Sequence, residues 1–172
     1  MSEENVKRKV LSVLSVEHQG ILPRVTGLFS RRGFNIDSIV ACRTETPEFS
    51  RWTLVVTGDE ATFTQLTRQL LKLEDVVKVE VLEPENCSNS ELLLIKVAAE
   101  GAARGGVLKA AQTYGSRVLD IGEKTVTLEM TGQSEEVDRF VEHMERTGIL
   151  EMARTGMTAL ERGDSTIYRQ EP

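Results

Sequence analysis

The sequence predicts an α+β fold, because segments typical of strands and helices follow one another in the order βαββαβ, and this order occurs twice. The two copies start roughly 75–80 residues apart, which indicates duplication of one unit rather than a repeat array. Such a unit folds into an antiparallel sheet with both helices on one face, so we expect two tandem ferredoxin-like domains. The opposite face of each sheet is then uncovered, and pairing of units within the chain or between chains would cover it.

The first predicted strand covers residues 10–16, and its apolar side chains on both faces are typical of a central strand covered by helices. After a turn that ends at Gly20, residues 21–32 carry apolar side chains three and four positions apart, which predicts an amphipathic helix. Pro23 is tolerated in the first turn of this helix, and Gly33 is well placed to end it.

The rest of the first unit is predicted from strand and helix patterns bounded by turn residues. Two β-rich segments flank a turn that contains Pro47, which predicts a hairpin. Asp59 then opens an amphipathic helix, and a valine-rich strand completes the unit. These strands are expected at residues 34–44, 51–57 and 75–82, with the helix extending to residue 71.

A polar segment with a proline, residues 84–90, is predicted to be a linker between two domains. We therefore expect an N-terminal domain at residues 1–83 and a C-terminal domain at residues 91–172, whose last part, residues 159–172, is a polar tail. The second domain repeats the order of the first. Its elements are expected at residues 92–99, 101–114, 117–121, 124–130, 134–146 and 148–158.

Composition argues against several classes of function. The net charge is −6 and the pI is about 5.1, which argues against a general binder of nucleic acid backbones. Only 5% of the residues are aromatic, so a stacking surface for single strands is not expected. Apolar runs have only strand length and the N-terminus lacks a secretory pattern, so we expect no membrane span and no export. The two cysteines, Cys42 and Cys87, are predicted to be reduced thiols, which favours a cytoplasmic protein.

The turn at Gly20 is the candidate binding site. A helix that starts there offers unpaired N–H groups and the positive end of its dipole, and glycine lets a ligand approach the backbone. A small carboxylate would therefore suit the N–H groups of Gly20, Ile21 and Leu22. The side chains of Asn35 and Glu17 could accept hydrogen bonds from an amino group of the same ligand.

Apolar residues around this turn would accommodate an aliphatic side chain, so together the residues describe an amino-acid site. These apolar residues are Leu14, Ile21, Leu22 and Ile36. An alternative is that Gly20 only shapes a turn and Asn35 only caps a structural element. His18, in the same loop, could touch a ligand or simply lie exposed to solvent.

The sequence offers no pattern of catalytic or metal-binding residues. The glycine-rich segment at residues 101–106 lacks the spacing of phosphate-binding loops and is expected to connect a strand to a helix. Glu135 and Glu136 suit the start of a helix, and His143 is expected on a helix surface. No Ser/His/Asp, Cys/His or metal-ligand spacing is present, so the chain is not expected to be an enzyme by itself.

Several segments carry a family resemblance. The run at residues 20–39, GILPRVTGLFSRRGFNIDSI, together with Ser50 and Arg51, closely resembles the first ACT domain of the small regulatory subunits of acetolactate synthase (acetohydroxyacid synthase). The resemblance continues in the second half and covers nearly the whole chain. The further segments are residues 91–97 (ELLLIKV), 118–121 (VLDI), 126–132 (VTLEMTG) and 154–163 (RTGMTALERG).

The resemblance implies an N-terminal ACT domain and a C-terminal ACT-like domain, in a homodimer whose N-terminal sheets pair across the interface. It also implies a partner, the catalytic subunit of acetolactate synthase, which carries thiamine diphosphate, FAD and Mg²⁺, whereas the small subunit itself binds no cofactor. The holoenzyme condenses two pyruvates, or pyruvate with 2-oxobutanoate, on the route to valine, leucine and isoleucine. The small subunit raises this activity and confers feedback inhibition, usually by valine.

By the same resemblance, the effector site lies at the interface between ACT domains. It is expected to include Glu17, Gly20, Ile21, Leu22, Asn35 and Ile36. Glu17 stands where the family usually has Asn or Asp, and Gln19 where it often has Pro, Ser or Ala. A second interpretation is a free-standing ACT protein that senses an amino acid and acts on transcription. It would need a DNA-reading partner, since the chain has no evident helix-turn-helix or basic patch.

Overall fold

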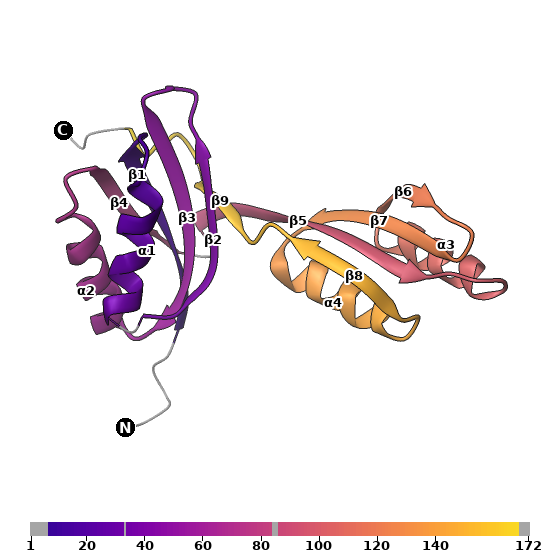
Figure 1. Cartoon of the computed structure of the whole chain (residues 1–172). Coiled ribbons are helices and arrows are strands. Elements are labelled where there is room, and N and C mark those ends of the chain that lie inside the picture. The colour runs from indigo at the N-terminus through magenta and orange to yellow at the C-terminus, as the bar shows by residue number, and fades with distance from the viewer. Residues whose placement is uncertain (1–6, 33, 84–85, 169–172) are drawn as a thin grey trace. The chain divides into compact units, whose positions relative to one another are not determined.

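The computed structural model describes residues 7–32, 34–83 and 86–168. The expected role of Gly33 at the end of a helix therefore lies outside the described residues. The order of elements is βαββαβ, then βαββαβ again, followed by one short strand (Figure 1). The α+β fold class and the duplication of one unit are thus confirmed.

The first unit contains a four-stranded antiparallel sheet in the order β2-β3-β1-β4, with both helices on one face (Figure 1). β1 lies in the interior of this sheet between β3 and β4, as its apolar pattern predicts. The elements are β1 (Lys7–Val16), α1 (Ile21–Arg32), β2 (Ile36–Arg43), β3 (Phe49–Gly58), α2 (Glu60–Leu70) and β4 (Val76–Leu82).

The core of this unit lies between the sheet and the two helices. On β1, Leu11 and Val13 face this core and are fully buried, while Val10 belongs to a separate cluster on the other face of the sheet. α2 begins where Asp59 caps it, because the backbone N–H of Thr62 donates to Asp59 Oδ1 at 2.7 Å. Its apolar residues at helical spacing, Phe63, Leu66 and Leu70, then pack into the core.

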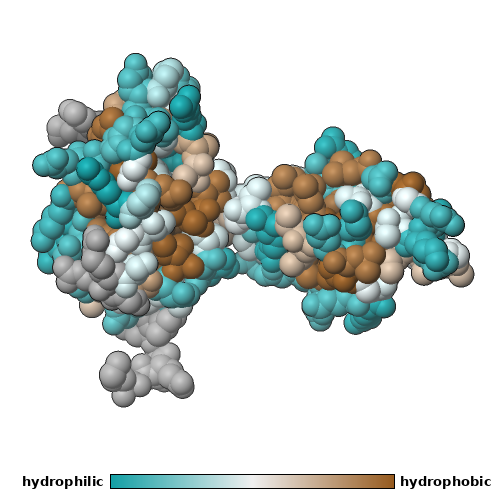
Figure 2. Space-filling view, in the orientation of Figure 1, coloured by the Kyte–Doolittle hydropathy of each residue, from teal (hydrophilic) through white to brown (hydrophobic). Residues whose placement is uncertain are grey.

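The second unit covers Asn89–Gly156, and its first strand begins two residues earlier, at Cys87. This unit repeats the sheet order of the first as β6-β7-β5-β8. The elements are β5 (Cys87–Ala98), α3 (Ala103–Thr113), β6 (Arg117–Ile121), β7 (Thr125–Gly132), α4 (Ser134–Glu145) and β8 (Ile149–Arg154). Its two outer strands keep apolar side chains exposed, such as Ile121 on β6 and Leu150 on β8, and Figure 2 shows hydrophobic surface on this unit.

The last part of the chain differs from the predicted polar tail. The C-terminal segment, residues 157–168, belongs to the first unit and contains β9 (Thr158–Glu161), which pairs with β5. Ala159 and Ile167 are almost fully buried, at 1% and 3% exposure. Ala159 packs in the cluster on the outer face of the first sheet, whose other members are Val10, Val55, Leu82 and Cys87.

This segment covers part of the outer face of the first sheet. The sequence suggested that pairing of whole units would cover it. A short stretch of the same chain lies over part of it, where Ala159 packs against Val10, Val55 and Leu82. The segment is also tied to the start of β5, where the backbone N–H of Arg162 donates to Asn86 O at 2.8 Å.

Candidate functional site

The loop between β1 and α1 is shaped by Gly20. This residue has φ = 95°, a conformation that favours glycine, and a side chain placed there would meet nothing within 4 Å. The space in front of the loop backbone is therefore open. α1 begins directly after it, with the N–H of Ile21 3.5 Å from His18 O.

A pocket of about 360 Å³, here called the loop pocket, opens at this turn. Four of the six residues expected in the effector site line it, namely Glu17, Gly20, Ile21 and Leu22. The other lining residues are His18, Ala41, Cys42, Arg43, Ser50 and Trp52. Its volume lies in the range of small-molecule sites, and its lining joins the start of a helix to polar and apolar side chains.

Glu17 is held by neighbours across the loop pocket. Its carboxylate accepts a hydrogen bond from Ser50 Oγ and lies 3.9 Å from Arg43 Nε. The register of the sheet brings these two residues there, because Arg43 on β2 is paired with Ser50 on β3. Sequence reasoning did not place Ser50 or Arg43 in the site. Their roles depend on strand register, and the only signal in the sequence was the resemblance at Ser50.

His18 anchors the loop to the rest of the first unit. Its Nδ1 lies 2.8 Å from Gln19 O and its Nε2 lies 2.8 Å from Asp75 Oδ1, while Arg24 Nη1 lies 2.7 Å from Asp75 Oδ2. With acceptors at both ring nitrogens, the backbone carbonyl of Gln19 and the carboxylate of Asp75 raise the pKa of His18. The close approach of His18 in turn lowers the pKa of Asp75. His18 is therefore a partner in a charged cluster rather than a merely exposed loop residue.

Asn35 and Ile36 lie at the other end of the first sheet. Ile36 is paired with Val56, whereas the loop pocket lies at the end where Val16 is paired with Phe49. The 12-residue helix α1 separates the two ends, and at 1.5 Å per residue it spans roughly 18 Å. Asn35 donates to Asp37 Oδ1 at 2.9 Å instead. Within one chain, Asn35 and Ile36 therefore lie apart from the loop residues, and their expected place in an effector site between ACT domains stays a prediction.

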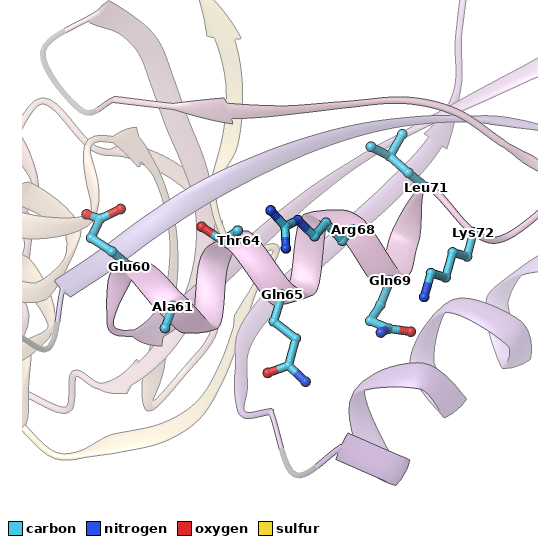
Figure 3. A pocket seen from close by; sticks show the side chains of 8 residues that line it. All are labelled: Glu60, Ala61, Thr64, Gln65, Arg68, Gln69, Leu71 and Lys72. Atoms are coloured by element: carbon cyan, nitrogen blue, oxygen red, sulfur yellow. The ribbon is translucent and has the colours of Figure 1, made fainter.

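A larger hollow of about 800 Å³ lies along the outward side of α2. Its lining residues all come from this helix and the turn after it, and Figure 3 shows Gln65 and Gln69 pointing away from Thr64 and Arg68. Because one helix cannot enclose a ligand, this hollow is not a candidate site.

Other features of the sequence have structural explanations. Arg104, in the glycine-rich segment, donates to Ala99 O at 3.1 Å and to Gly122 O at 2.8 Å, and so joins a strand end to a neighbouring turn. Glu136 takes part in a capping box with Gln133 at the start of α4. Among the described residues, no group of three or more His, Cys, Asp or Glu side chains could hold a metal ion. The helices in the described ranges are all too short or too polar to cross a membrane.

Two tandem ferredoxin-like units with a glycine-shaped pocket at the start of the first helix define an ACT-domain protein. A family model described as "AHAS small subunit-like ACT domain" matches residues 11–78, and one described as "Small subunit of acetolactate synthase" matches residues 90–163. The chain belongs to the family of acetolactate synthase small subunits.

Relatives and a solved structure support this assignment over the full length. The chain is 41% identical to the probable acetolactate synthase small subunit of Methanothermobacter thermautotrophicus, covering 97% of this chain and 100% of that protein. It is 39% identical to the acetolactate synthase small subunit of Mycolicibacterium smegmatis, covering 91% and 92%. The crystal structure of the acetolactate synthase small subunit from Thermotoga maritima matches with a TM-score of 0.86 and 32% identity, covering 92% and 99%.

Proposed function

We propose that this chain is the regulatory subunit of an acetolactate synthase, which raises the activity of a separate catalytic subunit and makes it sensitive to valine. The pathway is the biosynthesis of valine, leucine and isoleucine. The observation that carries this proposal is the loop pocket, a small cavity at the start of α1, in a chain whose full-length relatives are named as small subunits of this enzyme. We place thiamine diphosphate, FAD and Mg²⁺ on the catalytic subunit, and the role of this chain is regulation.

In the proposed site, the carboxylate of valine lies at the start of α1, near the backbone of Gly20 and Leu22. The helix dipole favours an anion there, and the positive φ of Gly20 leaves the approach open. The ammonium group faces Glu17, whose carboxylate has two neighbours but is 29% exposed. The aliphatic side chain packs against the apolar part of the pocket, which includes Ile21 and Trp52.

A second copy of the chain completes this site. β2 is an edge strand of the first sheet, and in a symmetric dimer two β2 edges can pair antiparallel. The start of β2 in one copy then lies beside the end of β2 in the other. Because Arg43 at that end lines the loop pocket, Asn35 and Ile36 of the second copy would reach the ligand there.

The regulatory mechanism is a shift between two arrangements of the dimer. Valine binds across the interface and favours the arrangement in which the two loop pockets are closed by Asn35 of the other copy. Inhibition follows only if the catalytic subunit is less active with this arrangement, because a ligand shifts an equilibrium by its difference in affinity for the two states.

Calorimetry and reconstitution test this function. Titration of valine into the full chain should release or absorb heat, and valine should inhibit the catalytic subunit only when this chain is present. Isobutylamine, which is valine without its carboxylate, should give no heat because it cannot use the helix N-terminus. No heat from valine, together with an uninhibited holoenzyme, would contradict the valine site. A pull-down that recovers a DNA-binding protein and no thiamine-dependent subunit would favour the transcriptional alternative.

A further inference from the structure

A second pocket lies on the other side of the first sheet. It has a volume of about 540 Å³ and is formed where the C-terminal segment crosses the outer face, so we call it the C-terminal pocket. The sheet contributes Cys42, Arg43, Thr44, Glu45, Arg51 and Glu80, and the segment contributes Thr158, Leu160, Glu161, Gly163, Ser165, Thr166, Ile167 and Tyr168. All these residues belong to the first unit. Cys42 and Arg43 also line the loop pocket, whereas the remaining residues line this cavity alone.

Arg51 is the unusual residue in the C-terminal pocket. Its Nη2 donates to Ala159 O at 3.0 Å, but its Nε is buried and has no hydrogen-bond partner within the described part of the chain. No carboxylate of the described residues lies within ion-pair distance of its guanidinium. Burial also lowers the pKa of Arg51, because water no longer solvates the charge fully. A half-buried guanidinium whose shielded Nε has no acceptor is costly unless an anion binds it.

The acidic residues described around the C-terminal pocket form no ion pair with Arg51, although Glu80 and Glu45 attract its charge and partly offset the effect of burial on its pKa. Glu80 lies 2.7 Å from Lys78 Nζ, and this pair draws its carboxylate toward the lysine. Glu45 and Glu161 are exposed at the rim of the cavity. The lining therefore combines a half-buried positive group with exposed negative groups, so a doubly charged phosphate would be repelled by the glutamates.

The remaining surface of the C-terminal pocket suits a small organic ligand. Ile167 is buried and the side chain of Leu160 is exposed, and both line the cavity, so the segment provides an apolar wall. Tyr168 also lines the cavity, and its ring centroid lies 6.4 Å from that of Phe49. The hydroxyl groups of Ser165 and Thr166 lie in the same lining and can donate or accept hydrogen bonds.

We propose that the C-terminal pocket binds an amino-acid-like zwitterion, with the ligand's carboxylate on Arg51, its ammonium group toward Glu45 or Glu161, and its side chain against the segment. The C-terminal pocket lies on the opposite face of the sheet from the loop pocket, and Cys42 and Arg43 on β2 line both. Ser50 and Arg51 are consecutive residues on β3, so their side chains lie on opposite faces of the sheet. The chain would then carry two amino-acid sites, and this second one does not depend on the proposed valine site.

Binding measured with the loop pocket saturated tests the proposal. The full chain is saturated with valine, and each of the other common L-amino acids is then examined by saturation-transfer NMR and calorimetry. At least one should bind, and Arg51→Gln should weaken its affinity by about tenfold or more, as expected for loss of a charge-assisted hydrogen bond. Arg68→Gln, a matched change at an exposed arginine on α2, should leave the affinity unchanged.

A second variant distinguishes a loss of binding from a loss of folding in Arg51→Gln. Ser165→Leu places a larger side chain in the pocket while leaving the contact between Arg51 and Ala159 intact, so it should block binding without lowering the melting temperature. The deaminated analogue of the bound amino acid should bind more weakly than the zwitterion. Failure of every amino acid to bind, or binding that survives both Arg51→Gln and Ser165→Leu, would overturn the proposal.

Discussion

Ser50 and Arg51 are neighbours on β3 that connect the first sheet to two different parts of the chain. Ser50 Oγ donates to the carboxylate of Glu17 in the loop pocket, and Arg51 Nη2 donates to Ala159 O in the C-terminal segment. Alternation of side chains along a strand accounts for the two directions. A single short stretch of β3 therefore supports both cavities of the first unit that have candidate ligands.

Gly20→Ala should destabilise the protein and weaken valine binding together. The site has room for a methyl group, so the cost comes from a positive φ in a residue with a Cβ and should be about 1 kcal/mol. Urea unfolding gives the first quantity and calorimetry the second. Gly105→Ala is the matched control. It lies in α3 with no atom within 4 Å of the added methyl group, so it should stabilise the protein by about 0.5–1 kcal/mol and leave valine binding intact.

Mixing two defective variants should restore part of the valine binding. Asn35→Ala and Gly20→Ala each damage a different half of the proposed composite site, so a mixed dimer contains one site with both halves intact. At equal mixing and free exchange of subunits, about a quarter of the sites should be intact. Trp52 is the only tryptophan and lines the loop pocket, so its fluorescence can report occupancy. If the mixture binds no better than the separate variants, Asn35 does not act across the interface.

Stability should depend on the charge of His18. A folded-state pKa that is raised above the ordinary value of 6.5 means that the protonated form stabilises the fold. This contribution is complete below that value and is lost as the pH rises through the raised folded-state pKa. His18→Gln should flatten the decline in unfolding free energy above pH 6.5, measured by urea titrations across that range. His143→Gln, a matched change on α4, should retain the decline; an unchanged decline in His18→Gln would contradict the role of the charged cluster.

Ile167→Ala should destabilise the first unit. Its side chain is 3% exposed, and truncation of a buried isoleucine costs about 2–4 kcal/mol. Leu160→Ala, in the same segment, should change stability by less than about 0.5 kcal/mol, because that side chain is 55% exposed. Hydrogen exchange at the backbone of β1 can locate the effect in the first unit. Equal and small effects of the two substitutions would show that the segment contributes little to this unit.

Most helices and strands could be predicted from the sequence because the pattern of apolar residues that indicates each one lies within a short segment. Helix α1 has the predicted limits, and the apolar pattern of β1 placed it correctly in the interior of its sheet. The C-terminal segment was missed because only single apolar residues, Ala159 and Ile167, anchor it, and isolated residues have no periodicity. Sequence spacing alone cannot indicate that such a segment returns to the first unit.

The candidate site was predictable only in part for the same reason. Gly20, Ile21 and Leu22 could be predicted because a glycine turn before an amphipathic helix is a local feature of the sequence. Arg43 and Ser50 reach the loop pocket through the register between β2 and β3, which the sequence does not specify. Within one chain, the length of α1 places Asn35 at the far end of the sheet, so its expected role in the site stays a prediction that needs a second copy of the chain.

The return of residues 157–168 makes the second unit an insertion within the first. The chain passes from the first unit into the second after Ser88 and comes back at Met157, so two covalent connections join them. A protein shortened before Met157 would always lose the C-terminal segment of the first unit, which would expose Val10, Val55 and Leu82 to solvent. The two halves of this gene product are therefore not separable modules, and a nonsense mutation late in the chain would damage its beginning.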